Sequence, residues 1–149
     1  MANKEGVFTS RRKSREEAFL LIFEKSFFED SIEEIIERAR ESRELDADDF
    51  TVKLASGVYE KLEAIDERIS EFIKGWRLNR LSRVVLSILR LSAFEMLFFT
   101  EEVPHSVSIN EAVELAKKYG GADDSSFING VLGSMSRKLA KPEENGSVK

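Results

Sequence analysis

The sequence has 149 residues, of which 42% are hydrophobic and 34% are charged, as is usual for a soluble globular protein. It contains no cysteine, which excludes a disulfide framework and a thiolate metal site, and its longest apolar run, AFLLIF, is far shorter than the ~18 residues of a membrane span. The net charge of −5 is uneven, because residues 1–15 carry +4 and the remainder carries −9. No signal peptide is recognisable, so we expect a cytoplasmic protein.

Helical periodicity runs through the chain and strand-like alternation is nearly absent, so we predict an all-α fold. The first helix is expected from about Ser10 to Phe28, capped by Thr9 or Ser10. A second helix is expected to begin at Ser31, which forms a capping box with Glu34. The helical pattern of this segment ends near residue 44.

A long apolar stripe predicts a third helix from Asp46 to Ile73, with a possible bend near Ile65–Asp66, and Gly75 ends this helix. The next segment, Arg80–Phe99, is apolar on most of its sides. Such a helix is typically central, so we expect Arg80–Phe99 to be the spine of the fold.

Two helices are expected to complete the chain. Ser108 forms a capping box with Glu111 at the start of the first, and Gly120 stops it. Asp123 or Asp124 caps the last helix. We expect residues 1–9 to be a flexible basic N-terminus, residues 10–140 to form a single helical domain, and residues 141–149 to be a frayed polar tail.

Catalytic motifs are missing from the sequence. The single histidine, His105, lies in a predicted loop, where histidine is usually solvated. The glycines of GADDSSFINGVLG do not have the spacing of a phosphate-binding loop, and Asp123–Asp124 without further ligands indicates a helix cap rather than a metal site. We therefore expect no enzymatic activity, no metal and no cofactor.

A cluster of cations marks the first helix: Arg11, Arg12, Lys13 and Arg15. Helix stability does not explain it, because the positive end of the helix dipole disfavours cations. One interpretation is a solvated, partly disordered end. The other is a phosphate-binding surface, in which Phe19 or Phe23 stacks an unpaired base; single-stranded RNA suits this better than a duplex.

The aromatic residues allow two interpretations as well. At helical spacing, phenylalanines such as Phe19, Phe23, Phe94 and Phe127 more often belong to the core than to a contact surface. Tyr119 ends its helix beside two glycines, so we expect it to be partly exposed.

Three blocks of the sequence resemble the NusB family of bacterial transcription antitermination factors. The longest is VPHSVSINEAVELAKKYGGADDSSFINGVL, and it is highly specific. RLSRVVLSILRLSAFEM resembles the central helix of the family, and SRRKSREEAFLLIFE resembles its arginine-rich first helix. Together these blocks span about Ser10 to Ala140.

The resemblance implies an all-helical fold of two small bundles packed around a long central helix, without catalysis. It implies binding of the boxA segment of nascent single-stranded RNA, jointly with the ribosomal protein NusE. NusA, NusG and RNA polymerase would complete the antitermination complex. No membrane partner is expected.

The resemblance also assigns residues position by position. In the basic motif and in the loop and helix start that line the same RNA face, the RNA-binding residues would be Arg11, Arg12, Lys13, Arg15, Phe19, Phe23, Asp123, Ser126, Phe127 and Asn129. Phe23 stands where relatives commonly have tyrosine, and Ser126 replaces a frequent lysine. The protein-partner residues would be Val85, Glu95 and Tyr119, with Val85 in place of an acidic residue that would face NusE.

Two alternatives stay open at this stage. One is a helical protein-interaction module, such as a homodimer, that binds no RNA of its own. The other is a domain linked to an enzyme, because NusB-like bundles also precede the cofactor-binding domain of some ribosomal-RNA cytosine methyltransferases. The sequence continues only to Lys149, so we expect no methyl transfer.

Overall fold

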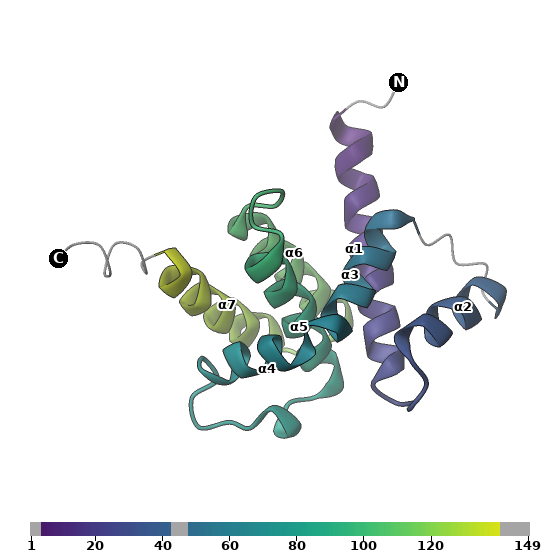
Figure 1. Ribbon diagram of the computed structural model, residues 1–149. Coiled ribbons are helices and arrows are strands. Elements are labelled where there is room, and N and C mark those ends of the chain that lie inside the picture. Colours follow the sequence, from purple (N-terminus) through teal and green to yellow (C-terminus); the bar gives the residue numbers. More distant parts are fainter. Residues whose placement is uncertain (1–3, 43–47, 141–149) are drawn as a thin grey trace. The chain divides into compact units, whose positions relative to one another are not determined.

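The structure is a computed structural model that describes the backbone of residues 4–42 and 48–140 and the side chains of residues 11–42 and 48–140. In these ranges the chain forms seven α-helices and one 3-10 helix and no strand, which confirms the predicted all-α class (Figure 1). The chain divides into two compact units, residues 1–62 and residues 63–149. The single domain over residues 10–140 stays a prediction, and the predicted tail after residue 140 lies outside the described residues.

The first unit contains three helices that contact one another in pairs: α1 (Lys4–Lys25), α2 (Ile32–Ser42) and α3 (Asp49–Glu60). Each contributes apolar side chains to a common core, because residues three and four apart share one face of a helix. The buried apolar residues are Ala18, Phe19, Leu21, Ile22, Ile32, Ile35, Ile36, Ala39, Leu54, Ala55 and Val58.

The first helix begins earlier and ends earlier than predicted. Its backbone is helical from Lys4, so Thr9 and Ser10 lie inside the helix and do not cap it. It ends at Lys25. The N–H groups of Phe27 and Phe28 then donate to the carbonyls of Glu24 and Lys25, three residues earlier. Whether residues 1–9 are flexible stays a prediction.

The predicted start of the second helix is confirmed. The Ser31 N–H donates to Glu34 Oε1 at 2.9 Å, and the Glu34 N–H donates to Ser31 Oγ at 3.1 Å. These two hydrogen bonds form a capping box, which satisfies donors that the first turn of a helix leaves without a partner.

A polar network joins α1 to α3. Asp48 caps α3 by accepting the Thr51 N–H at 2.8 Å, and Ser14 of α1 donates its hydroxyl to the same carboxylate at 2.6 Å. The Thr51 hydroxyl donates in turn to the Ser14 carbonyl. The predicted start of this helix, Asp46, lies outside the described residues.

The network also changes the acidity of its carboxylate. Partial burial by itself raises the pKa of Asp48, but hydrogen bonds from Ser14 and Thr51 and the positive charge of Arg11 outweigh this effect. The pKa of Asp48 therefore lies below its ordinary value, and the ionised carboxylate is the form that the fold prefers.

The single long helix predicted up to Ile73 is wrong, because α3 ends at Glu60 and α4 (Leu62–Ser70) follows after a break. At Lys61 the backbone leaves the helical region, with φ −111° and ψ 20°. The break therefore lies at Lys61 and not near Ile65–Asp66. Continuous apolar spacing did not reveal it, since both helices keep the same periodicity.

The second unit contains α4, the 3-10 helix η1 (Leu78–Arg80), α5 (Arg83–Phe98), α6 (His105–Tyr119) and α7 (Asp124–Ala140). Helix α5 contacts both α6 and α7, and α6 lies side by side with α7 (Figure 1). Ten of the sixteen residues of α5 are buried, as expected for the central helix of this unit.

Helix α5 begins at Arg83, later than predicted, because Ser82 caps it by accepting the Val85 N–H at 3.1 Å. Arg90 on this helix binds Asp66 of α4 through two hydrogen bonds of 2.9 and 2.8 Å. Both side chains are mostly buried. Such a bidentate pair fixes the orientation of both partners, so it holds α4 against α5.

The predicted capping box of Ser108 and Glu111 is wrong. Helix α6 begins at His105, directly after Pro104, so both residues lie beyond its first positions and both are buried. The Ser108 hydroxyl donates to the carboxylate of Glu95 on α5 at 2.6 Å. The Ser108 carbonyl accepts a hydrogen bond from Ser92 at 3.2 Å. Ser108 therefore joins two helices of the core.

The turn between α6 and α7 depends on Gly120. A Cβ atom at this position would lie 2.8 Å from Asp124 Oδ2 and 2.9 Å from the Ala116 carbonyl. The same Asp124 oxygen accepts the Gly121 N–H at 2.7 Å. Gly120 ends α6 as predicted, by allowing this close approach.

We predict that Ser108→Ala lowers the free energy of unfolding by about 1–3 kcal/mol, because a buried carboxylate loses a donor. Urea denaturation measures this loss. Ser106→Ala, on an exposed position of the same helix, is the matched control and should change stability by less than about 0.5 kcal/mol. Equal losses in the two variants would contradict the assigned role of Ser108.

We also predict a pH-dependent contribution from Asp48. Its pKa is lower in the folded protein, so the unfolded chain binds more protons in acid and stability falls as pH decreases. Asp48→Asn keeps a good capping residue, so its difference from the wild type reports the charge. The wild type should be the more stable protein at pH 7, and its advantage should disappear as pH falls through the folded pKa.

Urea denaturation between pH 7 and pH 3 measures this difference. Asp49→Asn removes the same charge one residue further along and serves as the control. A wild-type advantage over Asp48→Asn that is the same at both ends of the pH range would refute the role given to the carboxylate.

Candidate nucleic-acid interface

The cationic surface of the first unit is built on a stacked guanidinium group. Arg11 lies on α1 with its guanidinium carbon 3.9 Å from the centroid of the Phe50 ring, which α3 supplies. The aromatic face attracts the cation and leaves the edge of the guanidinium plane as a hydrogen-bonding fork. Phe50 thereby fixes the direction of a side chain that is otherwise exposed.

The other three cations of the cluster have different surroundings. Arg12 and Lys13 are exposed, as a phosphate contact requires. Arg15 is only 5% exposed, and its guanidinium carbon lies 5.4 Å from the centroid of the same Phe50 ring. Arg15 therefore supports the packing of Phe50 and presents little surface to a ligand.

Phe19 and Phe23 of α1 are less exposed than Arg11, Arg12 and Lys13. Phe19 is 1% exposed, which fits the core interpretation. Phe23 is half-buried and lies between Phe19, at 6.0 Å between ring centroids, and Phe27, at 5.0 Å. At 1.5 Å per residue, Phe23 is about 15 Å along the helix from Lys13. A nucleic acid that contacts both must follow α1 for nearly three turns.

The predicted RNA residues of the second unit lie at the start of α7. Asp123, Ser126 and Asn129 are exposed, and Phe127 is half-buried. The Asp123 carbonyl accepts the Phe127 N–H at 3.2 Å, which sets the first turn of the helix. The cationic cluster belongs to the first unit and these residues belong to the second, so the candidates come from both units.

The predicted protein-partner residues are mostly inside the second unit. Val85 is 4% exposed and Glu95 is 1% exposed, and Glu95 accepts the Ser108 hydroxyl. Tyr119 is half-buried, as expected, with the Lys118 ammonium group 5.5 Å from its ring centroid. Of the three, only Tyr119 presents a substantial surface to a partner.

Other kinds of site find little support in the described residues. No group of three or more histidine and carboxylate side chains is arranged to hold a metal ion in the ranges 11–42 and 48–140. His105 bonds Ser136 at 2.9 Å and Thr100 at 3.3 Å, which gives the imidazole a structural role beside α7. None of the helices described combines the length and the hydropathy needed to cross a bilayer.

Sequence reasoning missed three residues that organise the cationic surface: Ser14, Asp48 and Phe50. Phe50 belongs to the apolar stripe that predicts a helix from Asp46 to Ile73. Its spacing does not indicate that a guanidinium group covers its ring.

A model of the NusB family matches residues 12–137. The transcription antitermination protein NusB of Clostridium novyi is 41% identical over 130 residues, covering 85% of this chain and 97% of the relative. The protein of the same name from Acetivibrio thermocellus is 44% identical over 138 residues, covering 91% and 94%.

Solved structures agree with these relatives. The structure of T. maritima NusB superposes with a TM-score of 0.80 at 34% identity, covering 93% of this chain and 97% of that one. A structure of the antitermination factors NusB and NusE in complex with double-stranded RNA matches with a TM-score of 0.76 at 26% identity, covering 86% and 96%. The chain therefore belongs to the NusB family.

Proposed function

We propose that this protein is a transcription antitermination factor that binds boxA-type single-stranded RNA together with NusE. The cationic surface for the RNA consists of Arg11, Arg12 and Lys13, and Phe50 orients it. The factor acts in the cytoplasm, in a complex with NusA, NusG and RNA polymerase, and it catalyses no reaction.

The stacking of Arg11 on Phe50 is the observation that carries this proposal. A guanidinium group fixed in direction loses less conformational freedom when it forms a two-pronged contact with phosphate. Arg12 and Lys13 follow directly and are exposed. The three side chains concentrate positive charge on a protein whose remainder is acidic, so an anionic ligand is favoured locally.

The family relatives support the choice of partners. One solved relative is a complex of NusB and NusE with double-stranded RNA. For this chain we favour an unpaired strand, because the ring of Phe23 is only half-buried and its exposed part can contact a splayed base. The acidic remainder suits a basic ribosomal protein such as NusE, since opposite charges favour encounter. Tyr119 and the start of α7 are the candidate contacts of the second unit.

We predict that the affinity for a boxA-type single strand falls with salt, and that Arg11, Arg12 and Lys13 contribute about −2 to the log–log slope, at about −0.7 for each phosphate contact. Arg11→Ala with Arg12→Ala should flatten the slope by about 1 to 1.5, because two contacts are lost. Fluorescence anisotropy of labelled RNA between 50 and roughly 200 mM salt measures both slopes.

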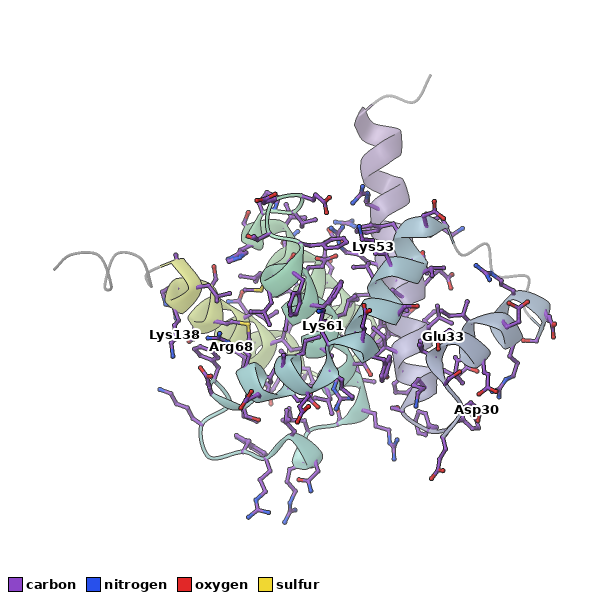
Figure 2. The ribbon with its side chains drawn as sticks, viewed as in Figure 1. Asp30, Glu33, Lys53, Lys61, Arg68 and Lys138 are labelled. Carbon is purple, nitrogen blue, oxygen red and sulfur yellow. The ribbon has the colours of Figure 1, made fainter. Side chains whose placement is uncertain are left out.

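The matched control is Lys53→Ala with Lys61→Ala, which removes two exposed cations from the same unit (Figure 2). Its slope should stay close to that of the wild type. A slope that is unchanged in the arginine variant, or reduced equally in both variants, would contradict the assignment of RNA to Arg11, Arg12 and Lys13 of α1. A duplex of the same sequence should bind more weakly than the single strand.

A further inference from the structure

A second cationic segment lies in the other unit, and the proposed function has not used it. No aspartate or glutamate occurs between Glu71 and Glu95. Within this interval, four cations lie between the end of α4 and the first turn of α5: Lys74, Arg77, Arg80 and Arg83. All four side chains are exposed. We call residues 74–83 the tryptophan loop, because it also contains Trp76.

The backbone of the tryptophan loop is held in a defined path. Gly75 adopts φ +79°, a conformation that glycine tolerates best, and the Trp76 N–H donates to the Ile73 carbonyl at 3.1 Å. Two further bonds of 2.9 and 3.1 Å form η1, and the cap by Ser82 follows. Backbone hydrogen bonds therefore fix the conformation of the loop.

The side chains of the loop divide into two sets. Leu78 and Leu81 are partly buried, and Ile73 directly before the loop is buried, which anchors the loop to its unit. Trp76, in contrast, is 57% exposed. Among the exposed large apolar residues in the described part of the chain, this is the highest value. A tryptophan left in water is a frequent feature of binding surfaces, since its ring gains much on burial.

The cations around Trp76 are available to a ligand. In the described part of the chain, the side chains of Lys74, Arg77 and Arg80 form no ion pair or hydrogen bond. This contrasts with Arg68 and Arg90 of the same unit, which pair with Glu71 and Asp66. Repulsion between neighbouring cations without a counter-charge is relieved when an anion binds.

We propose that the tryptophan loop is a second RNA-binding surface, in which Trp76 stacks an unpaired base while Arg77 and Arg80 contact the adjoining phosphates. This inference rests on the proposed function, in that the ligand is RNA. A flat ring beside exposed cations matches a strand of stacked bases on a charged backbone. The carboxylates of an acidic protein surface would pair with the cations, but they would not stack on the exposed ring.

Trp76 is the only tryptophan of the chain, so its fluorescence reports on this loop alone. We predict that a single-stranded RNA oligonucleotide quenches the fluorescence of the full chain and shifts its emission. The quenching should persist in Arg11→Ala with Arg12→Ala once the RNA concentration is raised to saturation. A blunt duplex should quench far less, because its bases are already stacked with one another.

Variants give a second measurement, using the anisotropy of labelled single-stranded RNA. Trp76→Ala should weaken binding by about tenfold, and Trp76→Phe should restore most of the affinity because a ring remains. Arg77→Ala with Arg80→Ala should flatten the salt slope by about 1.4. Arg137→Ala with Lys138→Ala removes two exposed cations from the same unit and should leave the slope near the wild-type value.

The outcomes separate this proposal from the previous one. RNA that binds by anisotropy without quenching Trp76, and with equal affinity for Trp76→Ala, would overturn the role of the loop and leave the role of α1 standing. Quenching of Trp76 together with an unchanged salt slope in Arg11→Ala with Arg12→Ala would overturn the role of α1 and leave the role of the loop standing. Equal quenching by a blunt duplex, or by poly-glutamate at the same charge concentration, would overturn the proposal for the loop in favour of simple charge attraction.

Discussion

The hydrogen bonds among Ser14, Asp48 and Thr51 are the constraint on which the proposed RNA surface of the first unit depends. They join α1 to the first turn of α3, and two residues after Asp48 the chain places the Phe50 ring beneath the Arg11 guanidinium. Without this connection, Arg11 would be one more exposed side chain of α1 with no fixed direction. The lowered pKa of Asp48 belongs to the same arrangement, because Arg11 contributes to it.

The two proposed surfaces, one in each unit, combine the same kinds of side chain on different elements. In the first, a helix presents cations and a ring from a neighbouring helix orients one of them; in the second, a short loop presents cations around an exposed ring. Both surfaces belong to a protein with a net charge of −5, so long-range attraction to RNA is weak and binding relies on local contacts.

Comparable sequence patterns gave different structural outcomes, and burial explains the difference. Ser31 and Glu34 are exposed and form the capping box that their spacing predicts. Ser108 and Glu111 have the same spacing, yet Pro104 starts the helix one turn earlier and leaves both facing the core. The cationic residues of α1 were recognisable from charge alone, but the burial of Arg15 and the contact of Phe50 depend on tertiary packing, which periodicity does not encode.

The central claim is that residues 11–23 of α1 contact an unpaired RNA strand directly. Photochemical crosslinking of 4-thiouridine-substituted single-stranded RNA to the full chain, followed by mass spectrometry of the peptides, tests it most directly. The account predicts crosslinks within residues 11–23, with a second group in residues 74–83. Crosslinks that fall only elsewhere, and spare residues 11–23, would contradict it.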